Sequence, residues 1–126
     1  MLGTAGELST HAVETKLLPE LAGRFALDLS KLSIQEMFVA KYSADPGGLK
    51  QLEEHEDDSK WSFVLALNDG EEHYGGGGTR FVELEGAPVF RPRVGSASMF
   101  SGKNRHCGVA TTAGTRYILA GFLKYG

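Results

Sequence analysis

The sequence contains one cysteine, Cys107, in 126 residues. A lone thiol excludes an internal disulfide, so a core must form by packing alone, which a chain of this length and 41% hydrophobic content can achieve. A chain with so little cysteine fits a reducing compartment better than a secreted one. We therefore expect a soluble, cytoplasmic protein.

Long runs of one kind of residue are also absent. The 16 acidic and 13 basic residues are interspersed and give a net charge of -3, which argues against a nucleic-acid partner. No apolar run is long enough to cross a membrane, and residues 1–16 lack the basic start and apolar stretch of a secretory signal. We expect neither a signal peptide nor a membrane partner.

Proline is scarce, with 4 residues against 17 glycines, and this balance points away from disorder. Together with the length, it predicts one domain over residues 1–126. Val13, Leu17 and Leu21, with helix-like spacing, predict an N-terminal helix over about residues 9–26, where Pro19 marks a split or kink.

After residue 28 the pattern changes to short runs of β-branched, aromatic and leucine residues, separated by turn residues. About eight such runs predict a mainly β fold, a double-stranded β-helix or jelly roll over about residues 34–123. The runs lie near residues 34–42, 49–55, 61–67, 79–84, 87–90, 96–100, 105–109 and 116–122. The glycine-rich residues 74–78 lack the Lys-Ser or Lys-Thr of a phosphate-binding loop and predict a mobile or close-packed loop.

A histidine and a carboxylate two residues apart form the first candidate site. At the end of a strand such residues point to the same side, so His55 and Asp57 can reach one metal ion. The alternative is a solvated acidic turn, because glutamates surround the pair. His106, at the start of a later strand, is the candidate third ligand. Two histidines and one carboxylate form a facial triad that suits Fe(II) and leaves positions open.

Ten residues after His106 stands Arg116, at the start of an apolar strand. A hairpin would bring the two residues to one opening of the fold. A planar guanidinium suits bidentate pairing with a carboxylate, although a surface cation is the alternative.

The chain resembles the catalytic domains of the prolyl and lysyl hydroxylases, and the lysyl hydroxylases more closely. The resemblance covers roughly residues 34–123, where three segments occur in the same order: HEDDSKWSFVLALND, GGGGTRF and HCGVATTAGTRYILAGF. Agreement of several separated segments is far more specific than any one of them. The resemblance implies a jelly-roll enzyme of the Fe(II)/2-oxoglutarate-dependent oxygenase superfamily.

Carried onto this sequence, the resemblance makes His55, Asp57 and His106 the iron ligands and Arg116 the partner of the distal carboxylate of 2-oxoglutarate. Tyr42 is a second candidate for contact with 2-oxoglutarate, with a packed core aromatic as the alternative. Four further residues match the family less decisively and are expected to shape the pocket: Ser59, Trp61, Asn68 and Arg80.

The activity implied is hydroxylation of a C–H bond by a dioxygenase that uses Fe(II), 2-oxoglutarate and O2 and releases succinate and CO2, with ascorbate as an additional cofactor. Peptidyl proline, peptidyl lysine and small molecules all stay open as substrates. Two alternatives also stay open: a non-catalytic jelly-roll binding module, and a cupin-like metal enzyme that does not use 2-oxoglutarate.

Overall fold

The computed structural model describes residues 10–126 of the chain. Contacts divide them into two compact units. The first holds the described residues up to Ser33 together with Lys124–Gly126, and the second holds Ile34–Leu123. Every candidate site residue lies in the second unit.

Three helical segments follow one another in the first unit: η1 (Val13–Leu17), α2 (Leu18–Phe25) and η2 (Leu29–Lys31). In the π-helical η1, the Leu18 N–H donates to the carbonyl of Val13, five residues earlier. Pro19 is the second residue of α2, directly after the π-helical turn, and its ring has no N–H to donate to that turn. The predicted N-terminal helix is therefore present, and Pro19 follows a change of helix type. Residue 9 lies outside the described residues.

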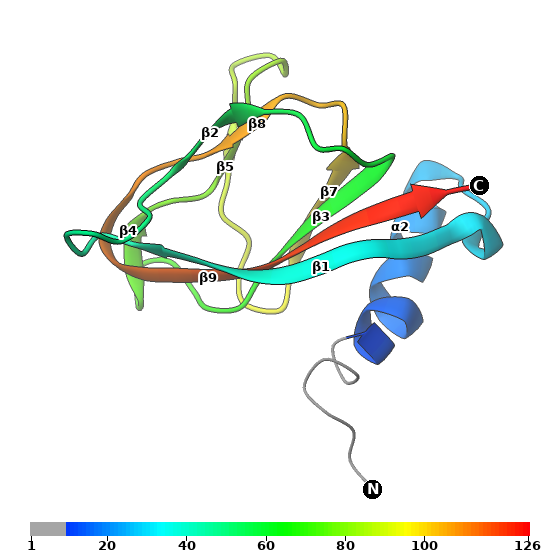
Figure 1. Ribbon diagram of the computed structural model, residues 1–126, viewed down its shortest axis with the longest axis horizontal. Coiled ribbons are helices and arrows are strands. Elements are labelled where there is room, and N and C mark those ends of the chain that lie inside the picture. The colour runs from blue at the N-terminus through cyan, green and yellow to red at the C-terminus, as the bar shows by residue number, and fades with distance from the viewer. Residues whose placement is uncertain (1–9) are drawn as a thin grey trace, which may run out of the picture. The chain divides into compact units, whose positions relative to one another are not determined.

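Nine strands lie in the described residues and form two antiparallel sheets (Figure 1). One sheet has the order β1-β9-β3-β7, with β4 also paired to β9, and the other has the order β2-β8-β5-β6. The strands are β1 (Leu32–Ser43), β2 (Leu52–His55), β3 (Trp61–Ala66), β4 (Tyr74–Gly76), β5 (Thr79–Phe81), β6 (Val89–Phe90), β7 (Ala97–Ser101), β8 (His106–Gly108) and β9 (Thr111–Tyr125).

The core lies between the two sheets because alternate residues of each strand point inward. On β9, the buried Arg116, Ile118 and Ala120 follow this period of two and line one cavity. A buried cluster joins strands of both sheets: Tyr42, Val64, Phe81, Phe100, Ile118 and Ala120. The predicted mainly β jelly roll is confirmed, with one strand more than the eight expected.

The extra strand is β4, in the glycine-rich stretch for which the sequence predicts a loop. Tyr74 pairs with Gly114 and Gly75 with Ala113 of the long strand β9. Glycine has little strand preference of its own, so the tertiary partner β9 decides the conformation here. The loop prediction is wrong for residues 74–76.

The predicted hairpin between the strands of His106 and Arg116 is also wrong, because β8 and β9 belong to different sheets. Between them the chain bonds to the glycine run. Gly77 N–H donates to the carbonyl of Ala110, and Val109 N–H donates to the carbonyl of Gly78. The connection therefore crosses from one sheet to the other, and His106 and Arg116 enter the interior from opposite sheets.

Across residues 10–126, every helix falls short of the length and apolar character that a membrane crossing needs.

Candidate functional site

The structure brings His55, Asp57 and His106 together in the space between the sheets. The Nε2 atoms of His55 and His106 each lie 3.3 Å from Oδ1 of Asp57. One possible ligand atom from each residue lies within 4.8 Å of the others. Two donors that bind one ion at about 2.1 Å and at right angles are separated by about 3 Å. The observed spacing therefore fits a shared metal ion.

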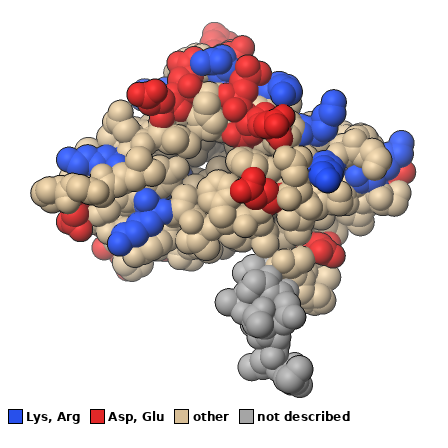
Figure 2. All heavy atoms as spheres, in the orientation of Figure 1, with Lys and Arg blue, Asp and Glu red and all other residues tan. Residues whose placement is uncertain are grey.

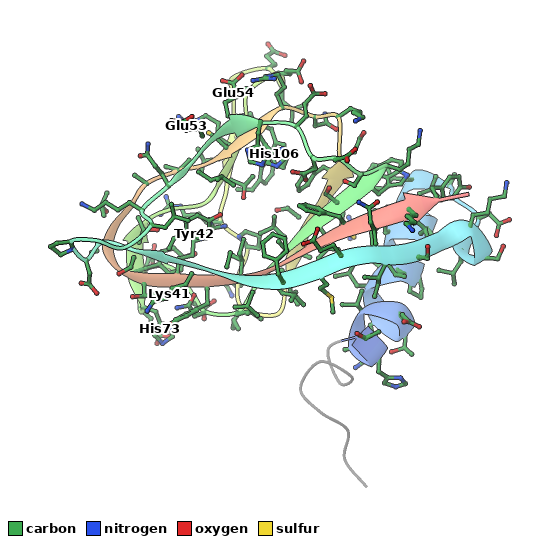
Figure 3. The ribbon with its side chains drawn as sticks, viewed as in Figure 1. Lys41, Tyr42, Glu53, Glu54, His73 and His106 are labelled. Carbon is green, nitrogen blue, oxygen red and sulfur yellow. The ribbon has the colours of Figure 1, made fainter. Side chains whose placement is uncertain are left out.

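Local pairing explains how the three residues meet. His55 on β2 is the cross-strand partner of His106 on β8, so both imidazoles project to the same side, with ring centroids 4.3 Å apart. Asp57 follows two residues after His55, and its N–H donates to the carbonyl of Gly102 at 2.8 Å. Figure 3 shows His106 pointing into the interior, while Glu53 and Glu54 lie outside it.

Each imidazole is held by a backbone carbonyl. His55 Nδ1 lies 2.6 Å from the carbonyl oxygen of Glu53, and His106 Nδ1 lies 2.8 Å from that of Asn104. A carbonyl only accepts, so both Nδ1 atoms must carry the proton, which assigns the tautomer from the hydrogen-bond partner. The Nε2 atoms that face Asp57 are then the ones free to bind a metal ion.

The carboxyl of Asp57 is held in its charged form. Burial disfavours that charge, but hydrogen bonds from His106 and Ser62 outweigh burial and lower the pKa of Asp57. The Ser62 hydroxyl is in turn 2.8 Å from that of Ser59. Burial likewise opposes protonation of His106, but its bonds to Asp57 and to the Asn104 carbonyl raise its pKa above the ordinary 6.5. A negative carboxylate therefore lies between two imidazoles.

The three residues line a cavity with about 510 Å³ of space, part of it open to solvent. The exposed Phe38 and Leu52 also line it, so the cavity reaches the surface beside β1 and β2. Phe100 packs edge-on against His106, with ring centroids 4.8 Å apart. The cavity is thus mostly apolar, with its polar groups at the histidine cluster and at Arg116.

Arg116 reaches the same cavity from the other sheet and is only 3% exposed. Its Nη1 donates to the carbonyl of Gly78 at 3.3 Å, and its guanidinium carbon lies 5.5 Å from the centre of the Tyr42 ring. No acidic side chain in residues 10–126 forms an ion pair with it. Burial lowers the pKa of Arg116 despite support from neighbouring tyrosines. A buried cation without a carboxylate partner makes this end of the cavity a site for an anion.

Tyr42 is buried and lines the cavity next to Arg116. Burial raises the pKa of its hydroxyl, and the nearby charge of Arg116 only partly offsets this, so the hydroxyl is neutral and able to donate. Figure 3 shows Tyr42 pointing inward from β1 towards the region of His106. Tyr42 therefore lies on the cavity wall beside Arg116.

The remaining residues singled out in the sequence lie outside the cavity wall. Ser59 supports Asp57 through Ser62, and Asn68 bonds to the backbone of β9 on both sides of Arg116. Arg80 is exposed and Trp61 is half-buried, and neither lines the cavity. His11 and His73 are exposed.

Sequence reasoning missed Ser62, Thr79 and Tyr74. Thr79 lines the cavity, and Tyr74 is buried against the Arg116 side chain. The alternation of Thr79 with the inward-facing Phe81 was a usable signal for Thr79. Tyr74 gave no such signal, because it opens a stretch that reads as a turn.

Comparisons with known proteins identify the family of this chain. The family model described as the 2OG-Fe(II) oxygenase superfamily matches residues 37–124. A multifunctional procollagen lysine hydroxylase and glycosyltransferase of Caenorhabditis elegans is 40% identical over 90 residues, which are 70% of this chain and 12% of that protein. The procollagen-lysine,2-oxoglutarate 5-dioxygenase 1 of Rattus norvegicus is 38% identical over 96 residues, 75% of this chain and 13% of that protein.

Among solved structures, a prolyl-4-hydroxylase of Pseudomonas putida superposes with a TM-score of 0.67 at 22% identity, covering 98% of this chain and 69% of that one. At this identity the likeness concerns the fold alone. The chain spans only 12–13% of the length of the two lysine hydroxylase relatives.

Proposed function

The chain belongs to the 2OG-Fe(II) oxygenase superfamily, and from that membership we propose that it carries the catalytic site of a 2-oxoglutarate-dependent dioxygenase that hydroxylates a substrate C–H bond. When bound, Fe(II), 2-oxoglutarate and O2 supply the oxidant, while 2-oxoglutarate is converted to succinate and CO2. The protein's part is to hold these groups in place and to limit access of water.

His55, Asp57 and His106 are the proposed iron ligands. Their donor set of two imidazole nitrogens and one carboxylate oxygen suits Fe(II) and occupies one face of the ion, which leaves positions for a co-substrate and O2. Support comes from the 3.3 Å spacing of the donor atoms and from the carbonyls that fix both Nδ1 atoms. The Phe100 ring packs against His106 and limits the access of water to that ligand.

The single observation that carries the proposal is the buried Arg116, which no acidic side chain of the described residues neutralises. We assign it to the distal carboxylate of 2-oxoglutarate, because its planar fork can donate two parallel hydrogen bonds to a carboxylate. Tyr42, on the same wall, is the proposed second contact with the co-substrate.

Peptidyl lysine is the proposed substrate, ahead of peptidyl proline. Two relatives that match over most of this chain are procollagen lysine hydroxylases by name. Exposed carboxylates lie next to the site in sequence, and Figure 2 shows acidic side chains gathered on that face of the molecule. They are Glu53, Glu54, Glu56 and Asp58, and of these Glu54 and Glu56 are partly neutralised by Arg105. A negative rim favours a cationic side chain.

The two alternative functions use fewer of these features. A non-catalytic binding module has no role for a buried, unneutralised arginine facing a histidine-carboxylate cluster. A cupin-like enzyme without 2-oxoglutarate would use the metal but leave Arg116 without its anion.

We further propose that the protein works in a reducing compartment, because it has a single cysteine. We also propose that ascorbate reduces the iron.

The test is an anaerobic titration of the purified protein with Fe(II) and 2-oxoglutarate, followed by visible absorption, and then by succinate release in air with a lysine-containing peptide. We expect a charge-transfer band that is lost in His106→Ala and kept in the matched variant His73→Ala, whose side chain is exposed and away from the cluster. Metal binding without a band on addition of 2-oxoglutarate would favour the cupin-like alternative instead.

A further inference from the structure

The Tyr74 side chain is buried near Arg116 and does not line the cavity. It is 5% exposed and is absent from the residues that line the cavity. Tyr74 pairs with Gly114, two residues before Arg116 on β9, so β4 is fixed beside the arginine's own strand. Tyr74 therefore reaches Arg116 from β4, beside the arginine's own strand.

Gly77 lies between these two side chains. A Cβ atom at Gly77 would be 3.1 Å from Cδ of Arg116 and 3.1 Å from Cε2 of Tyr74. Both side chains are thus in close contact with the bare Cα of this glycine, whose φ of +71° also disfavours any other residue. Gly70 also packs near the ring, since a Cβ there would be 3.5 Å from the Tyr74 hydroxyl.

Three groups then hold the guanidinium. The Gly78 carbonyl accepts a hydrogen bond from it at 3.3 Å, the Tyr42 ring centre lies 5.5 Å from its central carbon, and the nearby Tyr74 hydroxyl favours its charged form. A guanidinium has five N–H donors, so donors remain for a ligand in the cavity. A long, flexible side chain held at several points loses little further freedom when it binds.

We propose that Tyr74 is a positioning residue for Arg116, and that Tyr74 and Gly77 together set the preference of the site for 2-oxo acids with a second, distal carboxylate. This inference rests on the proposed function. Tyr74 itself touches neither the co-substrate nor the metal ligands. It acts by fixing the direction in which Arg116 presents its free donors.

The experiment compares two ligands of the anaerobic Fe(II)-loaded protein: 2-oxoglutarate, and 2-oxobutyrate, which lacks the distal carboxylate. Tyr74→Phe keeps the ring and removes only the hydroxyl. We expect it to weaken the binding of 2-oxoglutarate about 10-fold, because a buried charge loses a neighbouring polar group, and to change the binding of 2-oxobutyrate less than about twofold. The control is Tyr117→Phe, at an exposed tyrosine next to Arg116 in the sequence, and it should change the affinity for neither ligand.

Gly77→Ala provides a second variant with a matched control. Gly86 has a similar φ of +79° but nothing within 4 Å of an added Cβ, so Gly86→Ala has the same backbone strain without the contact. We expect Gly77→Ala to weaken the binding of 2-oxoglutarate but not of 2-oxobutyrate. Gly86→Ala should leave the affinity for both ligands unchanged. Equal weakening of both ligands in Tyr74→Phe, or no weakening of either, would overturn the inference. If the wild-type protein fails to bind 2-oxoglutarate, the proposed function itself is contradicted, and not only the inference about Tyr74.

Discussion

Two imidazoles and a carboxylate share a metal ion only when their protons are in the right places. The carbonyls of Glu53 and Asn104 fix one proton on each Nδ1, and this directs each Nε2 towards Asp57. In the metal-free protein a proton on His106 Nε2 is favoured by Asp57, which raises the pKa of His106. The same position must lose that proton before a metal ion binds.

Metal affinity should therefore fall on acidification. Because the pKa of His106 lies above 6.5, protons compete with the metal at all pH values below that raised pKa. We expect the apparent affinity for Mn(II), used as a redox-stable substitute, to drop by up to about tenfold per pH unit below it. Calorimetric titrations from about pH 8 down to about pH 6 measure this. An affinity that stays constant across the range would show that His106 is not a ligand.

Single residues of the site were predictable to different degrees. His55 and Asp57 could be paired from their spacing alone, and His106 and Arg116 from the residue types and the family resemblance. The environment of Arg116 was not predictable, because Tyr42 on β1 and the stretch that holds Tyr74 and Gly78 reach it from two segments distant in the sequence. Short-range patterns carry no information on such long-range contacts.

At the scale of elements, Asn68 continues a pairing that β3 no longer provides. β3 ends at Ala66, and the Asn68 side chain then bonds to β9 in place of the backbone. Its Nδ2 donates to the carbonyl of Thr115 at 2.8 Å, and its Oδ1 accepts from Tyr117 N–H at 2.9 Å. The backbone on both sides of Arg116 is thereby fixed.

Replacing Asn68 should loosen this part of β9. We expect Asn68→Ala to lower the free energy of unfolding by about 1–3 kcal/mol, because two backbone groups lose their partner. It should also weaken 2-oxoglutarate binding, since Arg116 is less well fixed. Asn68→Asp retains the acceptor but not the donor, so denaturant unfolding should place it between Ala and wild type. Wild-type stability of Asn68→Ala would contradict a role in holding β9.

The elements also show where sequence patterns are insufficient. The alternation of apolar residues predicted most strands, because each buries one face. It could not predict β4, whose glycines form a strand only beside β9. Nor could it predict that β8 and β9 separate into different sheets, because both a hairpin and a crossover begin with a short connection.

At the scale of the whole molecule, all proposed ligands lie in the unit of Ile34–Leu123. One domain over residues 1–126 stays a prediction. The relatives are about eight times longer than the region they share with this chain. The substrate of the whole protein therefore stays a proposal. Binding of the metal and of the co-substrate can be tested on this chain itself.

Ligand binding should stabilise the fold in two separable steps. A ligand at about 100 times its dissociation constant adds about 2.7 kcal/mol to the free energy of unfolding. In anaerobic thermal unfolding, we expect Fe(II) to raise the midpoint and 2-oxoglutarate to raise it further. Arg116→Ala should retain the first increment and lose most of the second. An increment from 2-oxoglutarate of the same size in Arg116→Ala would mean that the co-substrate binds elsewhere.

The most direct measurement of the central claim is an anomalous-scattering map of a crystal soaked anaerobically with Fe(II) and 2-oxoglutarate. We predict one iron peak bound by Nε2 of His55, Nε2 of His106 and a carboxylate oxygen of Asp57, with the distal carboxylate of 2-oxoglutarate on the guanidinium of Arg116. Iron at any other position, or a 2-oxoglutarate that leaves Arg116 without an anion, would contradict it.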